Sequence, residues 1–271
     1  MIDMFQTMFS YQFMVRALTV GVLVSLCAAL LGVSLVLKRY SMIGDGLSHV
    51  GFGSLAVATA LGLTPMAVTI PVVVVAAFLL LRLSTRGKLK GDAAIAMIST
   101  GALAVGVIVL SLSTGMTSDV NNYLFGSVLA MSASDVNLSV ILSIVVLVLF
   151  VAFYRRIFAV TFDETFARAS GWHAEWINML LAFLTAVTIV LGMRVMGAML
   201  ISSLVIFPAL TAMRVCKSFR SVTVCAALVS VVCYFIGLCL SYQFSIPAGA
   251  SVVVVNILAF GLFALIGRMR R

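Results

Sequence analysis

The chain has 271 residues, of which 63% are hydrophobic and only 9% are charged, and its mean hydropathy is +1.26. A soluble globular domain does not need so much apolar surface, so the soluble classes of protein are excluded. The formal net charge of +9 does not indicate a nucleic-acid partner, because the basic residues lie between apolar stretches and do not form one basic face. We therefore predict an all-α, polytopic transmembrane bundle whose basic residues set the topology and attract anionic membrane lipid.

Apolar stretches recur along the whole chain, which predicts a single transmembrane domain over residues 1–271. A helix needs about 20 residues to cross a hydrocarbon core of roughly 30 Å. Nine candidate spans lie at 17–37, 46–63, 65–83, 93–113, 134–153, 176–193, 196–213, 221–242 and 247–267. Pro65 and the glycines at 192 and 197 predict tight turns within two helix pairs. If one short candidate is a half-helix, the chain has eight spans instead of nine, and the side of the N-terminus changes.

The basic residues predict the orientation of these spans. Fifteen of the 17 Lys and Arg residues fall on one side of the membrane if the spans alternate. They are Lys38, Arg39, Arg82, Arg86, Lys88, Lys90, Arg155, Arg156, Arg168, Arg214, Lys217, Arg220, Arg268, Arg270 and Arg271. By the positive-inside rule this side is cytoplasmic, and the C-terminus lies there. The N-terminal segment has no cleavable signal pattern, so we expect the first span to remain in the membrane.

The start of the second candidate span carries two residues that can bind a metal ion. Asp45 and His49 are four residues apart and share one helix face, so a carboxylate oxygen and an imidazole nitrogen can approach one cation. A carboxylate near membrane depth costs about 2.5–3.5 kcal/mol and is usually kept for function. Alternatively, Asp45 caps the helix and His49 bonds to a backbone carbonyl.

Four glycines at 44, 46, 51 and 53 surround this pair. They are typical of the discontinuous helices at which transporters bind substrate, and equally of small-residue faces where helices pack closely.

Later spans contain isolated polar groups and one proline. Ser202, Ser203 and Pro208 lie in the seventh candidate span, where the proline removes a backbone donor. These residues either line a pathway or pack a kinked helix. Asn178 and Asn256 are single amides within spans, and we expect both to bond between helices.

The largest segment on the predicted cytoplasmic side, 154–175, contains a short helix pattern. Thr161 and Asp163 are alternative N-cap residues, Glu164 gives an acidic first turn, and Gly171 ends the helix. Phe162 and Phe166 fall on one face. Such a helix either lies on lipid or docks in the cleft of a partner protein.

Sequence motifs for catalysis are absent. The chain has no HExxH, GxSxG, CxxC or phosphate-binding GxxxxGK motif, and its five cysteines lie in or beside apolar spans as small hydrophobic residues. We therefore expect a non-enzymatic protein, with any catalytic or energy-coupling domain in a separate chain.

Four segments together resemble the zinc/manganese/iron ABC importer permease family. They are SMIGDGLSH at 41–49, KGDAAIA at 90–96, YLFGS at 123–127 and GAMLISSLVIFPALTA at 197–212. The resemblance covers nearly the entire chain and is strongest to the zinc-uptake permeases of Gram-negative bacteria. It implies an ABC importer permease of the metal-chelate type in the bacterial inner membrane.

This resemblance also implies partners and residue roles. The expected partners are a second copy of the chain, a cytoplasmic ATPase on each protomer and a periplasmic metal-binding protein. Zn²⁺ is the expected cargo, with Mn²⁺ or Fe²⁺ as alternatives, and no permanently bound cofactor is expected. Asp45 and His49 match the family's Gly-Asp-x-x-x-His stretch. The segment 163–171 matches its ATPase-coupling helix, which assigns coupling roles to Asp163, Glu164, Phe166, Ala167 and Gly171.

Two other functions compete with this interpretation. One is a stand-alone secondary transporter in which Asp45 or Asp92 relays protons, and the other is a structural membrane subunit without transport. The scarcity of acids within the spans favours the ABC permease, because proton-coupled carriers usually place several ionisable groups there.

Overall fold

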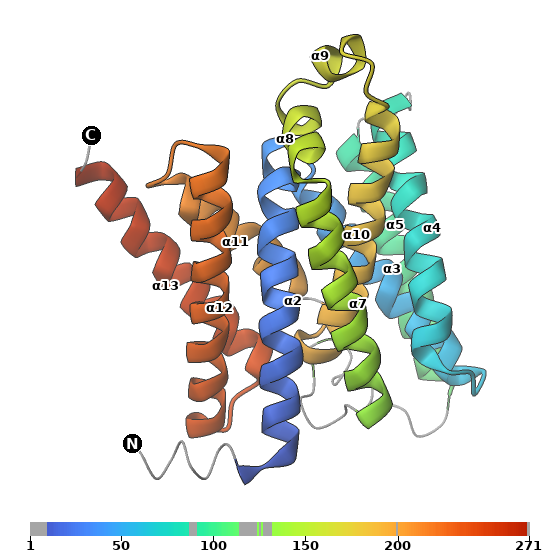
Figure 1. Ribbon diagram of the computed structural model, residues 1–271. Helices are drawn as coiled ribbons and strands as arrows, with labels where there is room; N and C mark the ends of the chain where they lie inside the picture. Colours follow the sequence, from blue (N-terminus) through green and yellow to red (C-terminus); the bar gives the residue numbers. More distant parts are fainter. Residues whose placement is uncertain are drawn as a thin grey trace.

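The computed structural model describes residues 10–86, 91–113, 124, 126, 132–198 and 200–269. All regular secondary structure in this part of the chain is helical (Figure 1), which confirms the all-α prediction. Most of the expected loop at 114–133 and the tip of the loop at 84–92 lie outside the described residues. The helices are α2 (Gln12–Leu37), α3 (Ser41–Ala60), α4 (Pro65–Arg86), α5 (Gly91–Leu112), α7 (Ala133–Ala152), α8 (Tyr154–Phe162), α9 (Glu164–Ala169), α10 (Ala174–Met196), α11 (Ile201–Met213), α12 (Phe219–Phe244) and α13 (Ala248–Met269).

Each of the nine predicted spans coincides with a helix, but not every one of these helices qualifies as a span. Seven helices in the described residues are long and apolar enough to cross a membrane, so the expected eight or nine is slightly too high. The two exceptions are α3 and α11. Helix α3 has the length, but Asp45, His49 and its glycines lower its hydropathy. Helix α11 is apolar but has only 13 residues.

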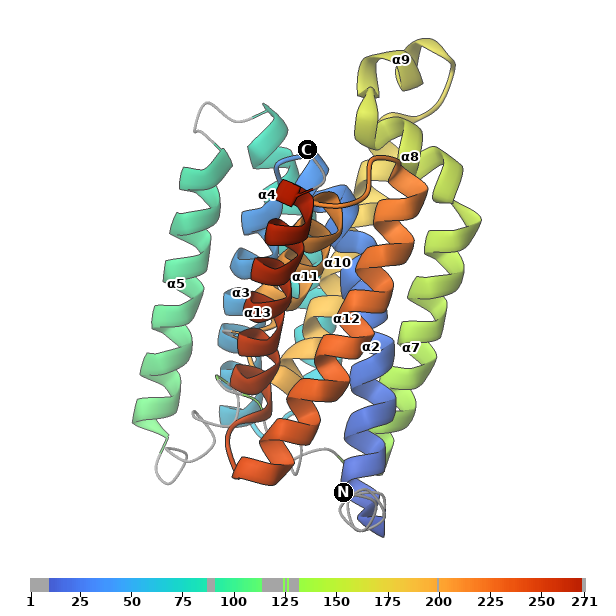
Figure 2. The ribbon, with the colours of Figure 1, turned by 90° about the vertical axis from the view of Figure 1, so that its left-hand side faces the viewer.

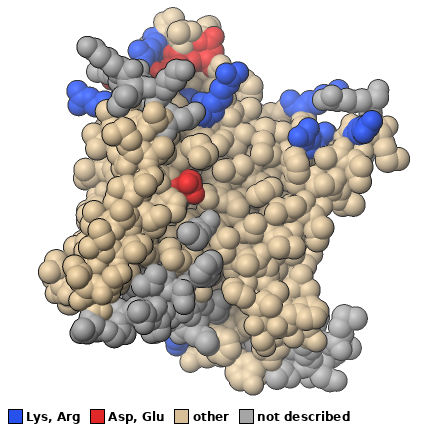
Figure 3. All heavy atoms as spheres, turned by 180° about the vertical axis from the view of Figure 1, so that it is seen from behind, with Lys and Arg blue, Asp and Glu red and all other residues tan. Residues whose placement is uncertain are grey.

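Within the described residues, the nine helices that coincide with predicted spans alternate in direction through the bundle (Figure 1). Helices α2, α4, α7, α11 and α13 run towards the end of the molecule where α9 lies, and α3, α5, α10 and α12 run back. The N-terminus and C-terminus therefore lie at opposite ends. We call the end with α9 and the C-terminus the basic end, because most of the Lys and Arg side chains visible in Figure 3 gather there.

Helices α2 and α10 form the centre of the bundle. In their most apolar windows 67% and 78% of the residues are buried, whereas the corresponding share in α7 is only 22%. The exposed residues of the outer helices are large and apolar, including Ile108, Ile141 and Leu262. Such residues suit a hydrocarbon environment, so the outer helices present a lipid-facing surface.

The glycines of α3 serve close helix packing. Helix α3 is continuous from Ser41 to Ala60, so the discontinuous-helix alternative is wrong. A Cβ atom added to Gly53 would lie 2.5 Å from the carbonyl oxygen of Ala102 on α5, and one added to Gly106 would lie 2.9 Å from the Cα of Gly53. The backbones of α3 and α5 thus meet without intervening side chains. Figure 2 shows α5 at the edge of the bundle, beside α3.

Buried polar side chains give mixed support to the expected bonds between helices. Asn178 bonds to groups of two other elements, as predicted. Asn256 donates instead to the carbonyl of Val252 in its own helix, at 2.8 Å, so the prediction for Asn256 is wrong. Tyr234 of α12 donates to the carbonyl of Ala17 of α2 at 2.9 Å, a contact between helices that the sequence did not reveal.

Candidate functional site

Asp45 and His49 face each other on α3. The helix begins at Ser41, so Asp45 lies in its second turn and does not cap the helix. The Asp45 Oδ2 and His49 Nε2 atoms are 3.6 Å apart, which is long for a hydrogen bond. Two ligands bound to one tetrahedral zinc ion at about 2.0–2.2 Å each are separated by roughly 3.4 Å. The observed separation is therefore close to the one that two ligands of a single cation require, and the two atoms need to approach only slightly to bind it.

Helix α11 brings a third polar group to this pair. The Ser202 hydroxyl lies 3.4 Å from Asp45 Oδ1, although the two residues are 157 positions apart in the sequence. The other two pathway candidates are not brought to the site in the same way. Ser203 donates to the Leu200 carbonyl of its own helical turn at 2.5 Å, and Pro208 is buried farther along α11. Of the three candidates, only Ser202 contacts the acid.

The second nitrogen of His49 decides against the packing alternative. His49 Nδ1 is buried and has no hydrogen-bond partner within the described residues. The carbonyl bond expected under the packing alternative is therefore not formed. Nδ1 is not the nitrogen that faces Asp45, so an ion held between Asp45 Oδ2 and Nε2 would leave this buried nitrogen unpaired as well.

The described residues offer an incomplete coordination shell. The described residues contain no group of three or more His, Cys, Asp and Glu side chains that could hold a metal ion. The Asp45 side chain keeps 36% of its accessible surface, whereas that of His49 keeps 14%. Together with the Ser202 hydroxyl, Asp45 and His49 are the polar groups that the described residues bring together here.

The short helix α9 extends from the basic end. Asp163 is its N-cap and accepts a hydrogen bond from the Phe166 backbone N–H at 2.8 Å. This bond lowers the pKa of Asp163 and settles the choice between the two cap candidates, because Thr161 belongs to the preceding helix. Gly171 has a φ of +82°, a backbone conformation that glycine adopts without strain.

Phe166 and Ala167, two residues of the expected coupling helix that we predicted to sit in a groove of the ATPase, have opposite environments. Phe166 is 65% exposed, so it is free to contact a partner. Ala167 is 1% exposed and packs into the hydrophobic core of its own chain. The assignment of Ala167 to a partner groove is therefore wrong, because the inner side of α9 rests on the bundle.

Three side chains from different elements meet where α9 joins the bundle. Lys38, directly after α2, donates to the side-chain oxygen of Asn178 on α10 and lies 3.5 Å from the Glu164 carboxylate of α9. The Asn178 amide donates to Glu164 at 3.0 Å. We call Lys38, Asn178 and Glu164 the junction triad. Sequence reasoning anticipated a bond for Asn178 but not this set, and the only available signal was a lysine directly after an apolar span.

The charges in the junction triad favour ionised partners. Burial raises the pKa of Glu164, but the hydrogen bond from Asn178 and the charges of Lys38 and Arg168 outweigh this effect and lower it. Burial lowers the pKa of Lys38, and the charge of Glu164 opposes that shift only in part. Glu164 is therefore a carboxylate at neutral pH.

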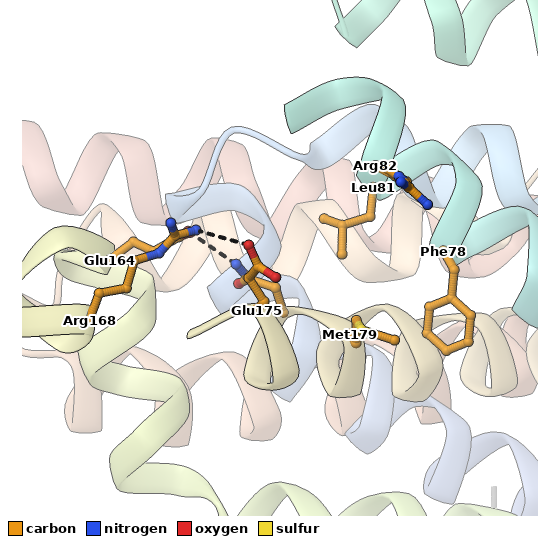
Figure 4. A pocket seen from close by; sticks show the side chains of 8 residues that line it. Phe78, Leu81, Arg82, Glu164, Arg168, Glu175 and Met179 are labelled. Carbon is orange, nitrogen blue, oxygen red and sulfur yellow. Dashed lines mark hydrogen bonds and ion pairs between the residues drawn. The ribbon is translucent and has the colours of Figure 1, made fainter. Parts of the chain in front are cut away.

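A cavity of about 730 Å³ lies beside the triad, between α4, α9 and α10 (Figure 4). Arg168 forms ion pairs there with Glu164 at 2.7 Å and with Glu175 at 3.9 Å. The cavity is lined by Phe78, Leu81, Arg82, Glu164, Arg168, Glu175, Asn178 and Met179. Its charged rim belongs to the same junction between α9 and the bundle.

Comparisons with known proteins agree with this architecture. The chain is 30% identical over 252 residues to the high-affinity zinc uptake system membrane protein ZnuB of Haemophilus influenzae, covering 93% of this chain and 97% of that protein. It is 28% identical over 261 residues to the manganese transport system membrane protein MntC of Halalkalibacterium halodurans, covering 96% and 88%. The solved structure of PsaBC from Streptococcus pneumoniae in complex with Fab superposes with a TM-score of 0.87 at 26% identity, covering 97% of this chain and 95% of that one.

The family assignment rests on the whole chain. The sequence profile described as the ABC 3 transport family matches residues 10–267. Together with the seven apolar helices, this match confirms a multi-pass protein of the bacterial inner membrane and gives no support to a stand-alone, proton-coupled carrier. The chain belongs to the ABC 3 transport family.

Proposed function

We propose that the chain is the membrane-spanning subunit of an importer that passes a divalent transition metal ion towards the cytoplasm. The observation that carries the proposal is the Asp45–His49 pair, which offers one oxygen and one nitrogen ligand on a helix inside the bundle, with the Ser202 hydroxyl beside them. Relatives named for zinc and manganese transport support the same class of cargo.

Zinc is the first candidate for the ion. Imidazole nitrogen and carboxylate oxygen are ordinary zinc ligands, and two copies of Asp45 and His49 around a two-fold axis make a four-ligand set. Manganese prefers sites richer in oxygen, so it ranks second on the donor atoms alone. We propose a homodimer because two copies of Asp45 and His49 would complete the four-ligand set.

The energy source in this proposal is a separate ATPase docked on α9. The exposed Phe166 and the capped start of α9 suit a helix that enters a groove of a partner. A periplasmic binding protein delivers the ion at the opposite end of the bundle. Glu164, the residue directly after the N-cap, holds α9 to the bundle through its contacts with Lys38 and Asn178.

Uptake by reconstituted vesicles tests the proposal. Vesicles carrying the chain with its ATPase and binding protein receive radioactive Zn²⁺, Mn²⁺ or Fe²⁺ in parallel, with ATP inside or absent. We expect ATP-dependent accumulation that is fastest for Zn²⁺. Accumulation of none of the three ions would contradict the proposal, and faster accumulation of Mn²⁺ or Fe²⁺ would reassign the cargo.

A further inference from the structure

The junction triad joins three parts of the chain that are distant in sequence. Lys38 and Asn178 are 140 positions apart, and Asn178 and Glu164 are 14 apart. Lys38 follows α2 directly, Asn178 lies near the start of α10, and Glu164 is the first residue of α9. Any displacement of α9 relative to the bundle therefore acts on Lys38.

The lysine is held firmly. Its side chain is only 9% exposed, and it contacts both the Asn178 oxygen and the Glu164 carboxylate. A buried ammonium group without partners is strongly disfavoured, so Lys38 follows its partners when they move. Glu164 is more exposed, at 32%, and can move with α9.

The chain after Lys38 forms a tight elbow into α3. The Tyr40 backbone N–H donates to the Leu35 carbonyl at 2.8 Å, and Arg39 has a φ of +61°, the left-handed region that few non-glycine residues adopt. Helix α3 begins one residue later, at Ser41, and Asp45 lies on its second turn. The elbow leaves little slack between Lys38 and the metal pair.

We propose that Lys38 is a positioning residue that transmits movement of α9 to α3 and thereby to Asp45 and His49. This inference rests on the proposed function, because it assumes that an ATPase moves α9. Lys38 does not touch the metal ion or the ATPase. Its role is to make the position of α3 depend on the position of α9.

The main competing explanation is that Lys38 only stabilises the fold. A matched control exists at the opposite end of the bundle, where Arg194 of α10 forms a 2.7 Å ion pair with Asp135 of α7. Their side chains are 13% and 20% exposed, so this pair also joins two helices in a largely buried place. It contacts neither α9 nor the elbow. Loss of this pair therefore reports the cost of breaking an ion pair between helices without touching the junction.

The test compares Lys38→Met with Arg194→Met in the reconstituted transporter containing the ATPase and the binding protein. Three quantities are measured: ATPase retained on an affinity column, thermal stability in detergent, and metal ions imported per ATP hydrolysed. For Lys38→Met we expect retained ATPase and a fall of about tenfold in ions per ATP, within the usual range of coupling between two sites. Lys38→Arg keeps the positive charge and restores most of the ratio.

Several results would overturn the inference. These are an unchanged ratio in Lys38→Met, an equal loss of the ratio in Arg194→Met, or loss of the ATPase from the column with Lys38→Met. The last result would mean that Lys38 maintains the docking helix and does not transmit its movement. A separate variant tests whether the ATPase docks on α9 at all. If Phe166→Asp still retains the ATPase, the proposed docking is wrong, whatever the Lys38 variants show.

Discussion

At the scale of single residues, Asp45 and His49 are the side chains on which transport is expected to depend. Asp45→Asn keeps the size and the hydrogen-bonding capacity but removes the charge, and His49→Leu removes the nitrogen ligand. We expect zinc uptake in vesicles to fall to background in each variant, with normal protein level and ATPase retention. His173→Leu is the control, because His173 is the other histidine and lies before α10 at the basic end. Uptake near the wild-type rate in either site variant would remove the pair from the pathway.

The contact between α3 and α5 gives a prediction that does not involve metal. In Gly53→Ala the new methyl group would lie 2.5 Å from the Ala102 carbonyl oxygen, so the two backbones must separate. Overpacking of this kind costs about 1–3 kcal/mol, and we expect a lower unfolding temperature in detergent. Gly101→Ala on α5 is the control, because an added Cβ meets no atom within 4 Å there. Equal unfolding temperatures for the two variants would contradict the close backbone contact.

At the scale of elements, α9 combines a fixed inner side with an exposed aromatic residue. Because Phe166 is 65% exposed, Phe166→Asp places the new carboxylate in water in the free chain and does not disturb its fold. In a complex the same carboxylate would be buried without a partner, which is costly. We expect the variant to lose the ATPase on an affinity column while its thermal stability stays unchanged.

The matched control for this prediction lies at the far end of the bundle. Phe244 at the end of α12 is 66% exposed, so Phe244→Asp makes the same change in the same degree of exposure away from α9. It should retain the ATPase. If both variants retain it, α9 is not the docking element.

At the scale of the whole molecule, the alternation of nine helices predicts which side each end faces. Ser170 follows α9 at the basic end, and Ser245 follows α12 at the opposite end; both are exposed. In a background without the native cysteines, we expect Ser245→Cys to react with an impermeant thiol reagent added outside intact cells. Ser170→Cys should react only after the membrane is opened. The reverse pattern would invert the orientation taken from the basic residues.

The sequence predicted the course of the chain more fully than its contacts. Apolar runs located every long helix, because spanning a bilayer requires a continuous apolar stretch whatever the neighbours are. The approach of Ser202 to Asp45 and the assembly of the junction triad depend on packing between distant segments, which no local pattern encodes. The burial of Ala167 was missed for the same reason. The inner side of a six-residue helix is defined only by what it rests on.

The low apolarity of α3 has a consequence for how the protein is inserted into the membrane. The features that give α3 its proposed role, a carboxylate, an imidazole and several glycines, also weaken its partition from the insertion channel into lipid, because charged and polar side chains are costly in hydrocarbon. We therefore expect α3 to enter the bilayer only together with a more apolar helix. The next helix to be synthesised is α4, whose segment Pro65–Leu83 has a mean hydropathy of 2.4. A nascent chain that ends after α3 should leave that helix outside the bilayer, whereas one that extends through α4 should insert the two as a hairpin.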